Sequence, residues 1–294
     1  MILGIDVGYS HTKVTGEKVE FGFKSTIEEG ALDIGSSLVL EYNDKIYTVG
    51  EDAGIYATDI NKIETENFEI CLYTAIAKAM GRKTTETIDL VTGLPAQYYQ
   101  EQKDKLIKAL EGKNVTVSLN GKPKRFTIEN VIVFPQSAGV LLLNPELLVG
   151  DTCIVDIGGF TVDLSIFNGK KLRKLYTIEE GMNVVANKLV QKIKSEYEVS
   201  YDILKADDLL DSKMIIKDNK QVNIESLIES VLAAHYKIIE NRLKGIAEYN
   251  TSKRIFVGGG SKRLESFIDT DVAEDTVYTN SRAYYKIGVE KFER

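Results

Sequence analysis

Hydrophobic and polar positions alternate with the two-residue period of a half-buried strand in several stretches of the sequence, and glycines separate these stretches. In the clearest example, which begins at Asp151, the apolar run Cys153 to Asp156 leads to two glycines, and Thr161 to Phe167 then alternates. Asn168-Gly169 predicts a two-residue hairpin turn into a further strand. The start of the chain repeats this arrangement, with an apolar strand that ends at Asp6, a glycine turn and a polar-alternating strand. The pattern predicts two related hairpins, about one domain length apart.

Other stretches carry apolar residues at helical spacing. Between them, Asn43-Asp44 and Asn120-Gly121 predict tight hairpins, and Asp218-Asn219 predicts a smaller one. Asn223 is placed to cap the longest helix with its side chain. The predicted helices cover residues 67–80, 97–110, 140–148, a stretch after Gly181 that runs to about Glu196, 201–210, 224–246 and 281–292.

The chain has 294 residues, which is long enough for two domains that each bury a core. Its composition, 43% hydrophobic and 28% charged, is typical of a soluble globular α/β protein. No apolar run approaches the roughly 18 residues that cross a bilayer, and the chain opens with a strand instead of a signal peptide. We therefore expect a cytoplasmic protein that does not contact membranes. Cys71 and Cys153 lie in apolar stretches and are interpreted as two buried, reduced thiols.

The net charge is −7, and no cluster of Lys and Arg is interleaved with aromatic residues. An acidic chain of this kind does not favour direct binding to nucleic acid. If DNA is the cargo of this protein, we expect an adaptor protein to bind it.

The chemistry is expected at the two glycine turns. Glycines let backbone N–H groups converge on phosphate oxygens, and an aspartate just before them can hold a hydrated magnesium ion. Asp6 with Gly8 and Asp156 with Gly158 both have this arrangement. One such turn is weak evidence, whereas the duplicated hairpin predicts a nucleotide held between two related domains.

Three further positions are candidates for the site. Gln136 follows a strand, and its uncharged amide could orient an attacking water without repelling phosphate; the alternative is an ordinary turn residue. Gly258 to Gly260 follow another strand and could leave room for a ribose or base. His235 lies beside the apolar stripe of the longest helix and is interpreted as a packed histidine, whereas His11 lies in the first phosphate turn, where its backbone N–H matters more than its imidazole.

Five segments in order, IDVGYSHTK, FPQSAG, VDIGGFTVD, FVGGGS and NSRAYYKIG, resemble the nucleotide-site segments of the actin, Hsp70 and sugar-kinase superfamily. Within it, the compact length, the VTGLP strand and the ending AYYKIG are most similar to the bacterial ParM/StbA-type plasmid-segregation actins and their archaeal relatives. The resemblance covers nearly the whole chain, and the ordered set is more specific than any one motif.

The resemblance implies an actin-like (ribonuclease H-like) α/β fold with duplicated domains. Each domain is expected to contain a mixed five-stranded sheet with helices, and the nucleotide is expected in the cleft between them. Domain I is expected to span residues 1–149, with a small subdomain at roughly 20–85, and to be completed by the C-terminal helix 282–294. Domain II is expected to span residues 150–281, with a small subdomain at roughly 190–240.

The resemblance also implies roles for individual residues. Asp6 and Asp156 would hold magnesium, largely through water, while Gln136 positions the attacking water with help from Asp156 and Asp163. Tyr9 and Phe160 are larger than the residues common at these turns, so the details of the phosphate contacts differ from the family pattern. The phosphate-binding residues would be Gly8, Tyr9, Ser10, His11, Lys13, Gly158, Gly159, Phe160 and Thr161, and the nucleoside-binding residues would be Glu180, Gly181, Gly258, Gly259, Gly260 and Ser261.

The implied function is an ATPase, with GTP as a possible substrate, that depends on Mg²⁺ and is stimulated by its own polymerisation. Its filaments would segregate plasmid DNA through a DNA-bound adaptor. The alternatives are a non-segregating cytoskeletal or phage-borne filament, a small-molecule kinase and an Hsp70-like ATPase. A sugar kinase normally has a longer chain and an aspartate base in a substrate pocket, and an Hsp70-like chaperone has a substrate-binding domain after the ATPase.

Overall fold

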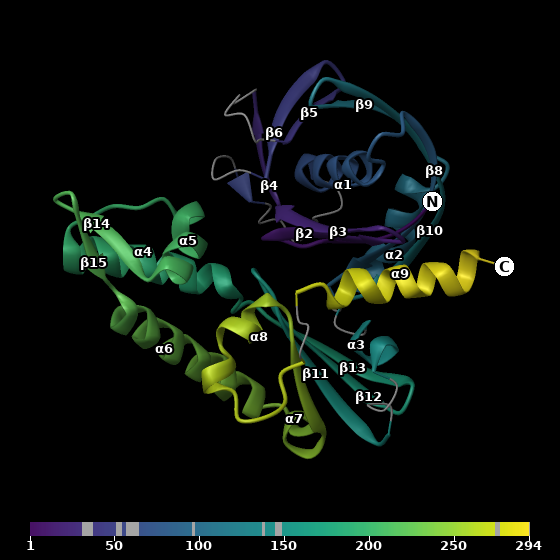
Figure 1. Ribbon diagram of the computed structural model, residues 1–294. Helices are drawn as coiled ribbons and strands as arrows, with labels where there is room; N and C mark the ends of the chain where they lie inside the picture. Colours follow the sequence, from purple (N-terminus) through teal and green to yellow (C-terminus); the bar gives the residue numbers. More distant parts are fainter. Residues whose placement is uncertain are drawn as a thin grey trace.

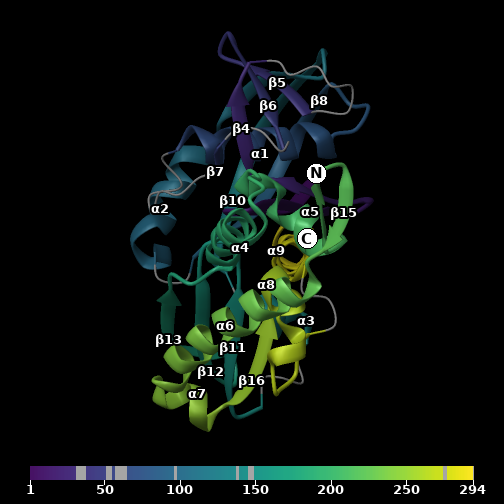
Figure 2. The same cartoon turned by 90° about the vertical axis from the view of Figure 1, so that its left-hand side faces the viewer.

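The computed structural model describes residues 1–30, 38–50, 55–56, 65–95, 98–136, 139–144, 149–273 and 277–293. Figures 1 and 2 show two lobes that meet along a central boundary, where the C-terminal helix also lies. We call the part built on strands β1–β10, together with α1, α2 and α9, lobe I, and the part from β11 to α8 lobe II. None of the described helices is long and apolar enough to cross a membrane.

Lobe I is built on a large mixed sheet. In the described residues its strand order is β3-β2-β1-β8-β10-β9-β5-β6-β4-β7. Strands β1, β8 and β10 run parallel, whereas β2 and β3 form antiparallel hairpins. The strands are β1 (Ile2–Val7), β2 (His11–Gly16), β3 (Val19–Lys24), β4 (Thr26–Glu29), β5 (Leu38–Tyr42), β6 (Lys45–Val49), β7 (Ile55–Tyr56), β8 (Thr85–Leu94), β9 (Asn114–Leu119) and β10 (Lys122–Pro135).

The large sheet curls around one helix, α1 (Glu66–Ala79), as Figure 1 shows. The long strand β10 contributes to this curvature. An irregularity between Ile128 and Asn130 divides it into two parts, and the first part also pairs with β9. Almost the whole circumference of α1 is buried, as its apolar sequence requires. Lobe I also contains α2 (Tyr99–Leu110), whereas α3 (Gly139–Leu143) lies between α9 and the sheet of lobe II, as Figure 1 shows.

Lobe II repeats the central part of this plan. Its main sheet has the order β13-β12-β11-β16, with β11 and β16 parallel and the other pairs antiparallel. In the described residues a single bridge between Phe256 and Val272 extends this sheet beyond β16, so four regular strands are described where five were expected. The strands are β11 (Asp151–Ile157), β12 (Val162–Asn168), β13 (Lys171–Ile178) and β16 (Lys253–Val257).

Helices cover the sheet of lobe II, and a small hairpin extends from it. His235 lies in α6 and is fully buried, with its Nε2 atom 3.0 Å from the carbonyl oxygen of Glu180, so its interpretation as a packed histidine agrees with the structure. The elements are α4 (Met182–Tyr197), the 3₁₀ turn Ile203–Lys205, α5 (Ala206–Ser212), β14 (Met214–Lys217), β15 (Lys220–Asn223), α6 (Glu225–Lys244), α7 (Ala247–Thr251), α8 (Gly259–Arg263) and the 3₁₀ turn Glu265–Phe267.

The closing helix α9 (Thr279–Phe292) packs against lobe I. Gly4 permits this contact, because a Cβ atom at this position would lie 2.1 Å from the carbonyl oxygen of Ser281. Arg282 adds two hydrogen bonds of 2.6 Å each to the carboxylate of Glu20. The helix begins two residues before the predicted start, at the boundary between the lobes.

Most predicted turns and helix ends are correct to within two residues, and the exceptions have local causes. Asn168 still pairs with Lys171, so the turn after β12 is Gly169-Lys170, with a positive φ of 54° at Gly169. Glycine at the first turn position favours this shift. The third helix ends at Leu143, and residues 145–148 of that prediction lie outside the described residues. The N-cap of α6 is Ile224 and not Asn223, but the Asn223 side chain still accepts a 2.9 Å hydrogen bond from the N–H of Glu225, the first residue of the helix.

Candidate functional site

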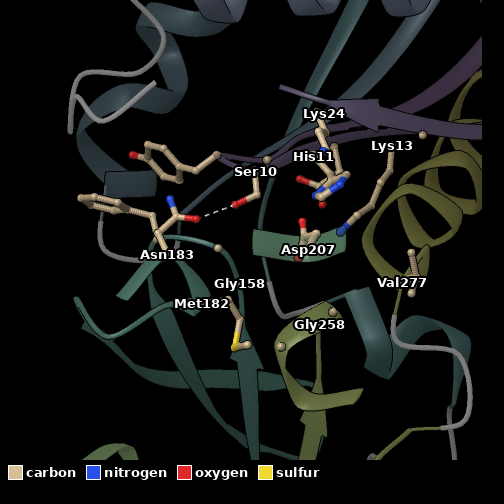
Figure 3. Close-up of a pocket in the computed structure, with 18 of the residues that line it drawn as sticks. Ser10, His11, Lys13, Lys24, Gly158, Met182, Asn183, Asp207, Gly258 and Val277 are labelled. Atoms are coloured by element: carbon tan, nitrogen blue, oxygen red, sulfur yellow. Dashed lines mark hydrogen bonds between the residues drawn. The ribbon is translucent and has the colours of Figure 1, made fainter. Parts of the chain in front are cut away.

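A cavity of about 1040 Å³ lies between the two lobes. Figure 3 shows residues of both lobes pointing into it, with His11, Lys13 and Asp207 near its centre. This volume is of the size that holds a small-molecule ligand. The predicted residues that line it are Asp6, Gly8, Tyr9, Ser10, His11, Lys13, Gln136, Asp156, Gly158, Gly159, Phe160, Thr161, Asp163, Gly258, Gly259 and Gly260.

The two predicted carboxylates lie at corresponding positions of the duplicated sheets. Asp6 is near the end of β1 and Asp156 is near the end of β11. The Nδ2 atom of Asn280 is 3.4 Å from Asp6 Oδ2 and 3.3 Å from Asp156 Oδ2, so one amide joins the two side chains. The Nε2 atom of Gln136 donates to the other oxygen of Asp6 at 2.8 Å. The structure therefore brings all three predicted catalytic residues together.

The cross-strand neighbours of these two carboxylates differ in charge. Asp6 is directly opposite Lys13 in the first hairpin, whereas Asp156 is directly opposite Asp163 in the second. Burial, followed by the negative charges of Asp163 and Asp6, raises the pKa of Asp156 to about 7, while Lys13 and the Asn280 amide act in the opposite direction. The floor of the cavity therefore has an excess of negative charge that a cation would neutralise.

This set of donors fits a hydrated magnesium ion. Magnesium prefers oxygen ligands and keeps several of its water molecules, so one or two carboxylates are enough to hold it. The described residues contain no cluster of three or more His, Cys, Asp or Glu side chains that could enclose a metal directly. Asp6 and Asp156 are the carboxylates that would hold such an ion, and coordination through water stays a prediction.

Asp163 is buried beneath the second glycine turn and accepts hydrogen bonds from Thr161, at 2.8 Å, and from Thr177. Burial raises its pKa to about 6, although both hydroxyl groups favour the ionised form. Asp163 therefore fixes Thr161 in the turn and adds to the negative charge around Asp156.

These pKa values predict how the stability of the nucleotide-free protein depends on pH. Because the folded pKa of Asp163 is above its unfolded value, the folded state binds more protons between about pH 4 and pH 7, and the free energy of unfolding falls as pH rises across this range. Asp163→Asn is expected to reduce the fall in melting temperature between pH 5.5 and pH 8. The matched control is Asp151→Asn, an exposed change in β11. An unchanged pH slope in Asp163→Asn would contradict this assignment.

The two glycine turns have the same backbone geometry. The Gly8 N–H donates to the His11 carbonyl at 3.0 Å, and the Gly158 N–H donates to the Thr161 carbonyl at 2.9 Å. These two N–H groups close the turns, so donation to a phosphate would fall to N–H groups further along each turn. The duplication predicted from sequence extends to individual hydrogen bonds.

The large side chains of the two turns contact each other. The rings of Tyr9 and Phe160 lie 4.9 Å apart between centroids, at an interplanar angle of 34°. Beside them, Ser10 Oγ donates to Asn183 Oδ1 at 3.1 Å, as Figure 3 shows. Gly159 is required here, since a Cβ atom would lie 1.7 Å from Ser10 Oγ. The contact between Tyr9 and Phe160, two side chains that are larger than the family pattern, joins the two lobes along one wall of the cavity.

The predicted nucleoside residues divide into two groups. Gly258, with φ of 88°, lies so close to Asp156 that a Cβ atom would be 2.3 Å from Asp156 Oδ1. Ser261 is buried and bonded to the Val257 carbonyl, so it lies behind the cavity wall. The structure does not place Glu180 or Gly181 on the wall either: Glu180 pairs with Arg242 at 2.9 Å, and the Gly181 N–H donates to the Phe160 carbonyl at 3.0 Å.

Several cavity residues could not be identified from the sequence. Arg263 of α8 bonds Asp211 at 2.7 Å and Asp207 at 3.4 Å, both in α5. Lys24 of lobe I donates to the Leu204 carbonyl of lobe II at 3.2 Å. Only Arg263, which follows the three glycines in α8, had a sequence signal nearby, whereas Lys24, Asp207 and Asp211 lie in segments without one.

His11 is surrounded by charged side chains of both lobes. Burial lowers its pKa, Asp207 opposes this effect, and Lys13, Lys24 and Arg263 lower the pKa further. The lowered pKa favours the neutral form of the imidazole.

Comparisons with known proteins agree with this geometry. Residues 4–139 match the family of actin-like proteins through its N-terminal domain, and residues 154–270 match the C-terminal domain of the archaeal MreB-like actin homologues. The two matches together cover most of the chain and include both glycine hairpins. The chain therefore belongs to the actin-like proteins, whose N-terminal and C-terminal domain models together cover most of it.

Solved structures share the fold over the whole chain. The archaeal actin homologue Ta0583 has a TM-score of 0.84 at 22% identity, with 99% of each chain covered. A 15-stranded ParM filament from Clostridium botulinum has a TM-score of 0.84 at 19% identity, covering 98% of this chain and 99% of that one. Ta0583 in complex with ADP has a TM-score of 0.83 at 22% identity, covering 99% of this chain and all of that one. No curated protein matches the sequence at a significant level.

Proposed function

We propose that this protein is a Mg²⁺-dependent ATPase whose active site is the cavity between the lobes. The observation that supports this most directly is the meeting of Asp6 and Asp156, one from each lobe, at the floor of a cavity lined by three glycine turns. Residues 1–149 with the helix 282–294 would form one domain, and residues 150–281 the other. ATP is the expected nucleotide, and GTP is an alternative that the cavity also has room for.

The residues around the cavity can divide the work of phosphoryl transfer. Lys13 and the N–H groups of the two turns would offset charge on the phosphate oxygens. This role matters because phosphoryl transfer is catalysed almost entirely by positioning and by electrostatic stabilisation. Bound magnesium would supply further neutralisation of phosphate charge. Gln136 would orient the attacking water while Asp6 holds its amide, with Asp156 as the neighbouring proton acceptor.

We further propose that the protein polymerises in a nucleotide-dependent way and that polymerisation stimulates hydrolysis. The contacts between the lobes support this, since Tyr9–Phe160, Ser10–Asn183 and Lys24–Leu204 would all change if the cleft opened or closed. The fold shared with a ParM filament is a second support. Segregation of plasmid DNA in the cytoplasm, through a DNA-bound adaptor, is the most specific form of the proposal and is compatible with the net charge of −7.

Sedimentation tests polymerisation. We expect the protein to pellet at high concentration with Mg²⁺ and ATP, to pellet less with ADP and to stay in the supernatant without nucleotide. GTP in place of ATP identifies the preferred purine. If the pelleted fraction is the same with and without nucleotide, the proposed filament is wrong.

A further inference from the structure

Asn280 is held at the boundary between the lobes by a helix that belongs to lobe I. It lies in the first turn of α9, and the carbonyl of its neighbour Ser281 sits against Gly4. The hydroxyl groups of Ser281 and Thr15 are 2.9 Å apart, and Arg282 forms its two hydrogen bonds with Glu20. The position of Asn280 relative to lobe I is therefore fixed by contacts outside the cavity.

The side-chain amide of Asn280 donates hydrogen bonds to one carboxylate of each lobe. Nδ2 carries two hydrogens, and its two acceptors are Asp6 Oδ2 and Asp156 Oδ2, at 3.4 Å and 3.3 Å. The opposite orientation would aim Oδ1 at two groups that only accept when ionised, so the observed orientation is the favourable one. Its Oδ1 atom is buried, and no described residue donates to it.

A neutral amide suits this position better than a charged side chain. Two carboxylates that face each other across a cleft repel, and a donor between them offsets part of this repulsion. A lysine there would offset it fully and compete with a metal ion for the same oxygens. A neutral amide instead holds the two carboxylates close together and leaves their negative charge available to bind a metal ion.

We propose that Asn280 is a positioning residue that holds Asp6 and Asp156 at the separation that a magnesium–nucleotide complex requires. This inference rests on the proposed function and adds to it a residue of the C-terminal helix that joins the metal-binding carboxylates of the two lobes. Asn280 acts through these carboxylates, so its loss should change the response to magnesium more than the binding of nucleotide itself.

The test is a magnesium titration of a fluorescent ATP analogue bound to the full chain. Asn280→Ala is expected to raise the Mg²⁺ concentration at half-maximal binding about tenfold, the usual effect of losing a group that orients metal ligands. Binding of the analogue in EDTA should stay at the wild-type level. Asn280→Gln, which keeps both donors on a longer side chain, should recover part of the magnesium response.

Glu290→Ala is the matched control, because it removes an exposed side chain from the same helix without touching the carboxylates or the contacts that fix Asn280. It is expected to leave the magnesium midpoint unchanged. A wild-type midpoint in Asn280→Ala, or an equal loss of binding with and without magnesium, would overturn the role of Asn280 alone. If the wild-type protein shows no magnesium-dependent binding, the proposed function fails as well.

Discussion

Replacing Asp156 with asparagine is expected to reduce phosphate release by about 100-fold or more while making the nucleotide-free protein more stable at pH 8. The loss is expected because asparagine cannot supply the charge that holds magnesium beside the phosphates, and removal of one such electrostatic group typically costs this much. The gain in stability follows from the raised pKa of Asp156: at pH 8 its ionised carboxylate is buried next to Asp163 and Asp6. Phosphate release and thermal unfolding measure the two effects separately.

Asp156→Asn is thus expected to lower phosphate release and to raise stability. These opposite changes distinguish loss of function from misfolding, because misfolding would lower both. Asp151→Asn makes the same chemical change at the start of the same strand, where Asp151 is exposed and its side chain accepts a hydrogen bond from Asn168. It should leave phosphate release unchanged. Undiminished phosphate release by Asp156→Asn would remove Asp156 from the site.

Gly4→Ala is expected to destabilise the protein by about 3 kcal/mol, the upper part of the usual range for overpacking. The added Cβ atom would lie 2.1 Å from the Ser281 carbonyl oxygen and 2.4 Å from the Tyr285 nitrogen. Both are backbone atoms of α9, so rotation of a side chain cannot relieve the contact, and the helix that carries Asn280 must move. Urea denaturation measures the loss of stability, and nucleotide binding is expected to fall with it.

Gly245→Ala is the control for the Gly4 substitution. Gly245 is exposed at the end of α6, has a φ of −70°, and a Cβ atom there would be 3.2 Å from the nearest atom, the Arg242 carbonyl oxygen. Its effect should stay within about 0.5 kcal/mol, as for other surface changes. Equal effects of the two substitutions would show that the contact between Gly4 and α9 does not determine stability.

The sequence predicts the elements of this fold well because its patterns are local. Alternation identifies the strands of both hairpins, and the pairs at Asn43-Asp44 and Asn120-Gly121 adopt the positive φ values that their turns require. The extent of the sheets is a tertiary property. The curling of the lobe I sheet around α1 depends on β10 serving two groups of partners, which no local pattern encodes.

The residues of the site also fall into two groups, those that local sequence patterns predict and those that are placed by tertiary packing. Residues in the glycine turns and at the strand ends, such as Asp6 and Asp156, could be predicted because their motifs are continuous in sequence. Asn280 could not be assigned a role, since its function depends on where α9 packs. Glu180 follows a strand beside the predicted site, but its side chain turns to Arg242, outside the cavity. A residue that reaches the site only through the packing of its own helix or strand has no local sequence motif that identifies it.

The central claim is that assembly controls hydrolysis at the cavity between the lobes. The most direct measurement is the rate of phosphate release per protein molecule, at saturating Mg²⁺ and ATP, over a range of protein concentrations that includes the onset of sedimentation. We predict a low, constant rate below that onset and a steep rise above it. A rate per molecule that stays constant while the protein pellets would contradict the claim.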